Sequence, residues 1–363
     1  MAHHRGPRDV DVRHDRAWGR TADGTPVGRW VLDDGTVSVR VVEHGARLQS
    51  VVVPDRDGNP ADVLLGFPDL RPYVSGGRSF GATVGRFANR IAGGRFTLDG
   101  VPHQIPVTDR GNAIHGGPAP FSEAHWASHA LSHRPGVRFS LLSPDGDNGF
   151  PGALSVHVDY VLHDGALLVE VLATTDAPTV LNLTNHAYWN LAGEGSGTVD
   201  AHLLQVAADT FLPIDDTGLP TGEFRDVVGT PFDLRSPTPV GYQLGRTDDE
   251  GQFALGKGFD HCFPLADVPG GQRDAAFAAR LEEPVSGRVL EVWTDQPGIQ
   301  VFTGGSLAGK LTGKAGVPYG PRTGIALETE ALPDAPNRPE FPGTELRPGE
   351  EFHSVTEFRF GAA

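Results

Sequence analysis

The sequence predicts an all-β protein that folds as one large antiparallel domain. Three observations support this prediction. Apolar and polar residues alternate with a period of two in many short segments, Asp-Gly pairs separate these segments, and no long stretch shows the 3.6-residue apolar spacing of a helix. Many short strands joined by close turns are typical of a β-sandwich or a β-barrel.

The clearest strand lies in residues 35–45, where Val37, Val39 and Val41 share one face and the residues between them are polar. Similar alternation predicts strands within residues 94–100, 136–146, 153–175, 202–208, 288–305 and 354–361. Asp-Gly pairs at 34–35, 57–58, 99–100, 145–146 and 164–165 supply the positive φ angles that tight hairpin turns require. A short helix is expected at residues 229–237.

The composition indicates a globular protein rather than a disordered one. The chain has 363 residues, of which 48 are glycine, 30 are proline and 38% are apolar, and this mixture suits a turn-rich β domain. We expect residues 1–25 to form a polar, loosely ordered N-terminal extension. Residues 26–361 are expected to form a single folded domain.

Charge and cysteine content restrict the partners and the location. The formal net charge of −16 argues against nucleic acid or an anionic membrane as the main partner. Cys262 is the one cysteine, so no disulfide can form within the chain, and a reducing cytoplasm is the simplest location. No apolar run resembles a signal peptide, and none approaches the ~18 residues of a membrane span.

Five segments carry more polar side chains than the strands of a core require. In residues 182–193, His186 and Tyr188 stand among asparagines and a threonine. Glu328 follows an apolar run, and burying a carboxylate costs free energy unless the group is paired or neutralised. The remaining candidates, from residues 85–94, 111–117, 258–263 and 296–302, are Asn89, Arg90, His115, Asp260 and Gln300.

Each of these residues also has a purely structural explanation. Arg90 could be a solvated or cation–π residue, His115 a turn residue beside two glycines, and Asp260 the cap of its own turn. Together, however, they supply a candidate base, two histidines, an arginine and several neutral donors and acceptors. This inventory favours reversible proton transfer on a neutral, hydroxyl-rich ligand such as a sugar.

Other chemistries fit the sequence less well. Residues 304–310 nearly match a phosphate-binding loop, but Leu311 stands where a serine or threonine must bind magnesium. Three histidines recur every four residues within 125–133 without a carboxylate or cysteine ligand, so we predict no metal site there. A glycoside hydrolase with Asp260 as the second carboxylate stays open, because the sequence does not fix the separation of the two carboxyl groups.

Six segments, in order, resemble the signature segments of the aldose 1-epimerase (galactose mutarotase) family: GRFANRIAGGRFTLDG, NAIHGG, LNLTNHAYWNLAG, GFDHCF, VFTGG and LETEALPDAPNRPEFP. The resemblance covers about residues 26–361 and implies a large antiparallel β-sandwich with a sugar cleft. It also implies cofactor-free interconversion of the α and β anomers of free aldoses. By position in these motifs, Glu328 resembles the catalytic base and His186 the catalytic acid. The positions that hold the sugar are matched by His115, Asn89, Arg90, Asp260, Gln300 and Tyr188.

Two features depart from the family pattern. Residues 118–126 read PAPFSEAHW where a Gly-Phe-Asp-like stretch is usual, so we expect this loop to reshape one wall of the cleft. Glu330 stands where glutamine is common. This second carboxyl group could raise the pKa of Glu328, or it could point away from it.

Two related functions remain as alternatives. A sugar-binding protein that has lost catalysis would not require both Glu328 and His186. A hexose-6-phosphate 1-epimerase would need a cationic cluster at the far end of the cleft, and no group of arginines and lysines accompanies the motifs. A monomer and a weak homodimer are both compatible with the sequence.

Overall fold

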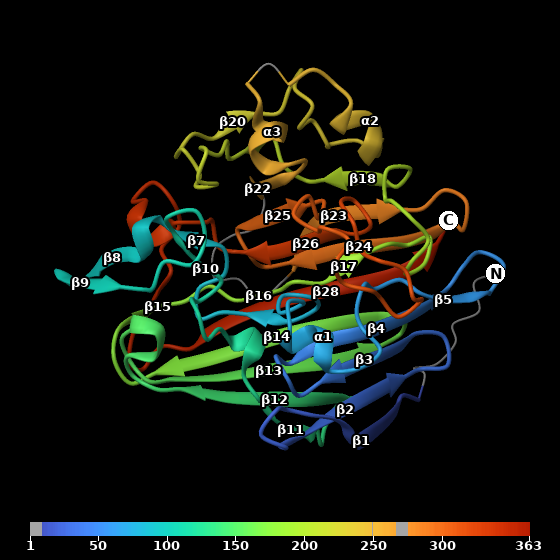
Figure 1. The fold of residues 1–363 in the computed structure, drawn as a ribbon, viewed down its shortest axis with the longest axis horizontal. Helices are drawn as coiled ribbons and strands as arrows, with labels where there is room; N and C mark the ends of the chain where they lie inside the picture. Colours follow the sequence, from blue (N-terminus) through green and yellow to red (C-terminus); the bar gives the residue numbers. More distant parts are fainter. Residues whose placement is uncertain (1–8, 249, 266–274) are drawn as a thin grey trace.

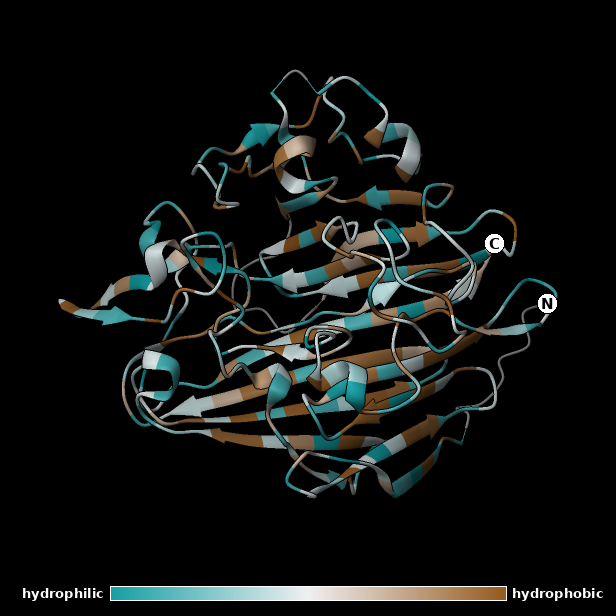
Figure 2. Cartoon of the chain, viewed as in Figure 1, coloured by the Kyte–Doolittle hydropathy of each residue, from teal (hydrophilic) through white to brown (hydrophobic). Residues whose placement is uncertain are grey.

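A nine-stranded antiparallel sheet forms the largest layer of the protein (Figure 1). The computed structural model describes residues 9–248, 250–265 and 275–363. The order of strands across this sheet is β11 (Ala127–Ala130), β12 (Gly136–Ser143), β13 (Leu154–His163), β14 (Ala166–Thr175), β28 (Phe352–Ala362), β24 (Arg288–Thr294), β23 (Ala276–Glu282), β18 (Leu203–Val206) and β21 (Thr238–Pro239). Figure 2 shows hydrophobic and hydrophilic residues alternating along its long strands, as a sheet with one buried face requires.

Two smaller sheets pack against this layer. A five-stranded sheet runs in chain order, and a four-stranded sheet has the order β17-β26-β25-β22. Val51, Val158 and Val301, one from each sheet, belong to the same buried apolar cluster, so the sheets share one core and the predicted β-sandwich is confirmed. The strands are β1 (Asp11–Arg20), β2 (Pro26–Asp33), β3 (Ser38–Val42), β4 (Arg47–Pro54) and β5 (Pro60–Asp62) in the first sheet, and β17 (Tyr188–Trp189), β26 (Ile325–Glu330), β25 (Gly298–Phe302) and β22 (Asp260–Pro264) in the second.

Short strand pairs and helical turns connect these sheets. The pairs are β6 (Thr83–Val84) with β16 (Thr184–Asn185), β7 (Arg90–Ile91) with β10 (Ala113–Ile114), β8 (Arg95–Leu98) with β9 (Val101–Gln104), β15 (Thr179–Val180) with β27 (Glu345–Leu346), and β19 (Thr210–Phe211) with β20 (Arg225–Asp226). The helices are α1 (Arg71–Val74), α2 (Val240–Leu244) and α3 (Gln252–Gly256), with 3₁₀ turns at Ala92–Gly94, Phe121–Glu123, Asp147–Gly149 and Ala335–Asn337. No helix in the described part of the chain is long and apolar enough to cross a membrane.

The predicted Asp-Gly turns all fall between consecutive strands. Asp164 and Gly165 join β13 to β14 with φ angles of 47° and 80°. Asp99 and Gly100 join β8 to β9 with nearly the same pair of angles, 50° and 80°. Two successive positive φ angles are the mark of a type I′ hairpin, whose twist matches that of the strands.

Two expectations about local structure are wrong. Residues 11–20, expected to be loosely ordered, form strand β1 and pair with β2. This is an edge strand in which charged side chains face solvent, so it lacks the apolar alternation that marks a buried strand. Residues 1–8 lie outside the described residues. The short helix expected at 229–237 is absent, and α2 begins at Val240 instead.

The fully buried guanidinium of Arg47 binds main-chain carbonyl groups from three separate loops. Arg47, at the start of β4, packs its guanidinium 4.4 Å from the centre of the Tyr73 ring. Burial lowers the pKa of Arg47 to about 10. Its nitrogens donate to five main-chain carbonyl oxygens, those of His44 (2.8 Å), Gly77 (3.4 Å), Arg78 (3.2 Å), Phe80 (3.0 Å) and Ser122 (2.5 Å). One side chain therefore fixes the path of residues 77–80 and of the 3₁₀ turn at 121–123.

A buried carboxyl group sits at the end of β26. Glu330 is fully buried and accepts a hydrogen bond of 2.9 Å from Nδ2 of Asn89. Burial raises the pKa of Glu330 from its ordinary 4.5 to about 8, against the opposing effect of the Asn89 hydrogen bond. The folded protein therefore holds a proton on Glu330 between pH 4.5 and about 8 that the unfolded chain has lost, so the free energy of unfolding falls as pH rises across this window.

Replacing Arg47 tests its role in the frame. We expect Arg47→Met to lower the free energy of unfolding by about 3 kcal/mol or more, because buried carbonyl groups lose charged donors. Arg47→Lys should have an intermediate effect, since it keeps the charge with fewer donors. Urea unfolding measures both. Arg71→Met is the control, because the Arg71 side chain is 90% exposed. An equal, small loss in Arg47→Met and Arg71→Met would contradict this role.

Replacing Glu330 tests the cost of its burial. Glu330→Gln keeps an oxygen for Asn89 but cannot titrate, so the loss of unfolding free energy between about pH 5 and about pH 8 should shrink by about 1–3 kcal/mol. Denaturant unfolding at the two pH values measures this difference. The exposed Glu351 provides a matched control, Glu351→Gln. An unchanged pH slope in Glu330→Gln would show that this carboxyl group does not carry the cost.

Candidate active site

Three adjacent strands bring Glu328, Gln300 and Asp260 onto one face of the four-stranded sheet. Glu328 on β26 lies directly opposite Gln300 on β25. Gln300 in turn lies opposite Cys262 on β22, two residues beyond Asp260, so all three polar side chains project the same way. Nε2 of Gln300 donates to Oδ1 of Asp260 at 2.7 Å. Antiparallel register therefore assembles a row of polar groups from residues far apart in the sequence.

His186 reaches the same face from the segment between β16 and β17. Its amide donates to the carbonyl of Ala82 at 2.9 Å, and its carbonyl accepts from the amide of Gly81 at 2.8 Å. Nε2 of His186 lies 3.5 Å from Oε1 of Glu328, and both side chains are about 95% buried. Oε2 of Glu328 has no hydrogen-bond partner within the described part of the chain, so this oxygen is available to a ligand.

Asn89 and His115 adopt left-handed backbone conformations to face the same space. Their φ angles are 60° and 53°, which only a few per cent of non-glycine residues adopt. The amide of Asn89 donates to Nδ1 of His115 at 3.1 Å. A neutral His115 must then carry its proton on Nε2, so the ring is a hydrogen-bond donor on its other side.

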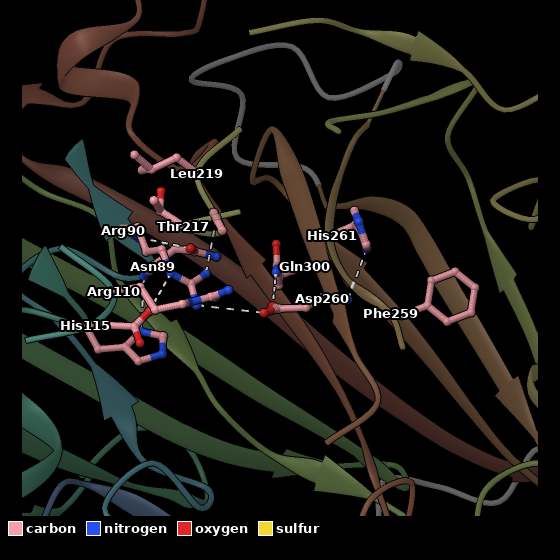
Figure 3. Close-up of polar contacts among 12 residues, drawn as sticks. Asn89, Arg90, Arg110, His115, Thr217, Leu219, Phe259, Asp260, His261 and Gln300 are labelled. Carbon is pink, nitrogen blue, oxygen red and sulfur yellow. Dashed lines mark hydrogen bonds and ion pairs between the residues drawn. The ribbon is translucent and has the colours of Figure 1, made fainter. Parts of the chain in front are cut away.

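Two carboxylates hold Arg90 across the site. Nε of Arg90 lies 2.8 Å from Oδ2 of Asp109, and its Nη2 lies 3.8 Å from Oδ2 of Asp260. Figure 3 shows Arg90 and Arg110 on one side of Asp260 and Gln300, with His115 and Asn89 close by. The guanidinium is thereby fixed and only 8% exposed.

These residues line a cavity of about 420 Å³. All eight residues that the sequence singled out belong to its wall: Glu328, His186, Asn89, Arg90, His115, Tyr188, Asp260 and Gln300. Tyr188 and Phe302 add aromatic surface beside His186, with ring centres 4.8 Å and 6.3 Å from the imidazole. The mixture of polar anchors and aromatic faces suits a small, hydroxyl-rich ligand.

The sequence analysis missed several wall residues, which include Ser79, Asp109, Arg110, Lys257 and Ser306. Three of them are cations or their partners beside the recognised motifs. Asp109 and Arg110 precede the segment of His115, and Lys257 immediately precedes the segment of Asp260. A search of the residues just before each motif could have found them. The expectation that no cluster of arginines and lysines accompanies the motifs is therefore wrong, since Arg90, Arg110 and Lys257 all line the cavity.

The two departures from the family pattern have different outcomes. None of residues 118–126 belongs to the described wall of the cavity, because Phe121 is buried in the core and Arg47 binds the carbonyl of Ser122. The expectation that this loop reshapes the cleft is wrong. Glu330 does not point away from Glu328, because residues two apart in a strand share a face.

Burial shifts the pKa of both members of the Glu328–His186 pair. Desolvation raises the pKa of Glu328 well above its ordinary value, and the nearby Glu330 and Asp260 carboxyl groups add to this, while Arg90 opposes it. Desolvation lowers the pKa of His186 to about 4. Burial therefore favours a proton on Glu328 over a proton on His186.

The second histidine is also neutral. Burial, followed by the charges of His186, Arg90 and Arg78, lowers the pKa of His115 well below its ordinary value. Its Nε2–H group is therefore a neutral donor, and its ring centre lies 5.5 Å from that of His186. No cluster of three or more metal-binding side chains occurs among the residues that the structure describes.

Comparisons with known proteins agree with the resemblance. The profile of the family described as Aldose 1-epimerase matches residues 28–359. The galactose mutarotase of Rattus norvegicus is 43% identical over 340 residues, which are 94% of this chain and 96% of the rat protein. The aldose 1-epimerase of Escherichia coli K12 is 38% identical over 342 residues, which are 93% of this chain and 96% of that protein. The crystal structure of galactose 1-epimerase from Lactobacillus acidophilus superposes with a TM-score of 0.83 at 28% identity, covering 98% of this chain and all of that one. The chain belongs to the aldose 1-epimerase family.

Proposed function

We propose that this protein is an aldose 1-epimerase that interconverts the α and β anomers of free aldoses such as galactose or glucose, without a cofactor. One observation carries the proposal: a carboxyl group and an imidazole lie 3.5 Å apart, almost fully buried, in the wall of a polar cavity. Anomer exchange needs a base at the anomeric hydroxyl and an acid at the ring oxygen. Glu328 is the base and His186 is the acid.

The proton count of the pair matches the reaction. Glu328 takes the proton of the anomeric hydroxyl while His186 gives its proton to the ring oxygen, and the bond between C1 and the ring oxygen breaks. The sugar is then an open aldehyde, Glu328 is protonated and His186 is neutral. Rotation about C1–C2 presents the other carbonyl face, and closure returns both protons. One proton stays on the pair throughout, so no exchange with solvent is required.

The bound sugar selects the starting arrangement. Burial favours a proton on Glu328. An anomeric hydroxyl that donates a hydrogen bond to Glu328 favours the ionised carboxylate and leaves the proton on His186. The same site is thus suited to opening in one proton arrangement and to closing in the other. Each positioned acid or base typically contributes ~10²–10⁴-fold to the rate.

The remaining wall residues orient the sugar. Asp260 and Gln300 are fixed to one another and accept or donate to ring hydroxyls. Arg90 and the neutral His115 donor can stabilise negative charge that develops on the opening ring oxygen. Tyr188 provides an apolar face for the ring. Fixed donors and acceptors hold C1 between the two catalytic groups, which lowers the entropic part of the barrier.

We propose that the active form is a monomer or a weak homodimer. The single buried cysteine, Cys262, suits a reducing compartment, which supports the cytoplasm as its location.

Removing the base tests the function. Polarimetry on freshly dissolved α-D-galactose and α-D-glucose should show faster approach to the equilibrium rotation with the wild-type protein. Glu328→Gln should lose ~10²-fold or more of this rate, because the amide cannot accept the proton. The exposed Glu351→Gln is the control. Near-normal turnover by Glu328→Gln would exclude it as the base, and no acceleration by wild type would favour a sugar-binding protein.

Removing an anchor tests the division of roles. Asp260→Ala should raise KM or the galactose Kd by about tenfold, a change of about 1.4 kcal/mol, while it changes kcat less. His186→Asn should show the opposite pattern, with a large loss of kcat and nearly unchanged binding. Steady-state polarimetry and calorimetric binding separate the two quantities. Equal losses of kcat in both variants would contradict the separate roles.

A further inference from the structure

Two arginines in the wall of the cavity share a single carboxylate oxygen. Nε of Arg90 lies 2.8 Å and Nε of Arg110 lies 3.5 Å from the same atom, Oδ2 of Asp109. Asp260 adds a longer contact of 3.8 Å to Arg90 alone. Asp109 is thus the one carboxylate with an ion pair to Arg110 within the described part of the chain. Two planar guanidinium groups placed together fit a carboxylate or a phosphate better than they fit a neutral hydroxyl.

A glycine keeps the two guanidinium groups side by side. A β-carbon on Gly218 would lie 2.4 Å from Nη2 of Arg110 and 3.0 Å from Cζ of Arg90, so both groups pack against the turn between β19 and β20. The Gly218 carbonyl also accepts a hydrogen bond of 3.3 Å from Nη1 of Arg90. In Figure 3 both arginines lie beside Thr217 of this turn. The turn therefore supports the paired guanidinium groups from outside.

A third cation lines the same cavity. Lys257 follows helix α3 in a left-handed conformation, with a φ angle of 56°. Its ammonium group makes no ion pair within the described part of the chain. Arg90, Arg110 and Lys257 thus line the cavity together with the carboxyl groups of Asp109, Asp260 and Glu328, in a protein whose net charge is −16.

The arginine pair joins the polar row through Asp260, and neither arginine forms an ion pair with Glu328 within the described part of the chain. The row begins with Glu328 beside Gln300 and continues through Asp260 to Arg90. Asp109 then links Arg90 to Arg110, which is 36% exposed. The anomeric carbon must lie at the Glu328 end. The part of the sugar that is remote from C1 therefore faces Arg110.

We propose that Arg110, with Arg90 and Lys257, forms an anion subsite that takes aldoses bearing a carboxylate or phosphate on the carbon remote from C1. Uronic acids and hexose 6-phosphates are the two sources of this chemistry. The inference rests on the proposed function, since the orientation of the sugar follows from the positions of the base and the acid. The neutral aldose binds the inner part of the cavity, and the anionic substituent adds a charge-assisted contact at the anion subsite.

Calorimetric binding measures the subsite independently of turnover. The ligands are galactose, galacturonate, the uncharged methyl ester of galacturonate, and galactose 6-phosphate, each at low salt. We expect at least one anionic sugar to bind about tenfold or more tightly than galactose and the methyl ester, with an advantage that falls as salt is added. Preference for galacturonate alone would identify a uronic acid subsite, and preference for the phosphate alone would identify a phosphate subsite.

Variants assign the preference to the anion subsite. Arg110→Gln should reduce the ratio of anionic to neutral affinity to near one, and Lys257→Gln should reduce it partly. Arg71 is exposed and is not among the described wall residues, so Arg71→Gln should keep the wild-type ratio. If galactose and the methyl ester of galacturonate bind as tightly as both anionic sugars, or if Arg110→Gln keeps the full ratio, the proposed subsite is wrong. Circular dichroism of each variant establishes that the fold is retained.

Parallel polarimetry keeps this proposal separate from the proposed function. Mutarotation of galactose without any preference for anionic sugars would overturn the subsite and leave the epimerase assignment standing. A preference that depends on Arg110, without mutarotation of any aldose, would support the subsite and overturn the assignment of catalysis.

Discussion

The joint burial of Glu328 and His186 is the constraint on which the site depends. In water a glutamate and a histidine that share one proton place it on the histidine. Burial raises the pKa of Glu328 and lowers the pKa of His186, so it shifts the proton toward the carboxyl group, and a hydrogen bond from the bound sugar to Glu328 shifts it back. An aldose 1-epimerase must use both positions of the proton, on the carboxyl group and on the imidazole, because its reaction opens and closes the ring with the same two groups. Desolvation therefore sets up the reversibility that the chemistry requires.

Holding two such groups in place requires a rigid frame around them. The antiparallel register of β25 and β26 fixes Glu328 beside Gln300, and the amide and carbonyl of His186 are both bound to the segment that ends at Ala82. Arg47 holds the preceding residues of that segment through their carbonyl groups. The buried guanidinium of Arg47, which is not in the described wall of the cavity, thus contributes to the position of His186, the proposed acid. Such support matters because small displacements of reacting groups are costly to the rate.

Local patterns in the sequence predicted what depends on local physics. Period-two alternation identified the long strands, and Asp-Gly pairs identified the hairpins, because both follow from backbone geometry. The charged edge strand β1 lacks alternation, and Arg47 looks like an ordinary polar residue at the start of a strand. Neither the five carbonyl partners of Arg47 nor the pairing of Arg110 with Arg90 can be derived from neighbours in the chain. Both depend on loops that meet only in the folded protein. The turn at Gly218, for example, packs against Arg90 and Arg110 although it lies more than 100 residues away in the sequence.

Carboxylates and cations alternate along the cavity, and this order separates two electrostatic tasks. The base must keep a raised pKa, and Arg90 is the neighbouring cation that lowers it. Asp260 and Asp109 flank Arg90 and share its charge, while Glu330 and Asp260 act on Glu328 in the opposite direction. Arg110 lies beyond Asp109, one carboxylate further from the base, and Coulomb interactions weaken with distance and with solvent exposure. A cation at that position can attract an anionic substituent without lowering the pKa of the base. Arg110 can therefore set the substrate preference while Glu328 and His186 keep their roles in proton transfer.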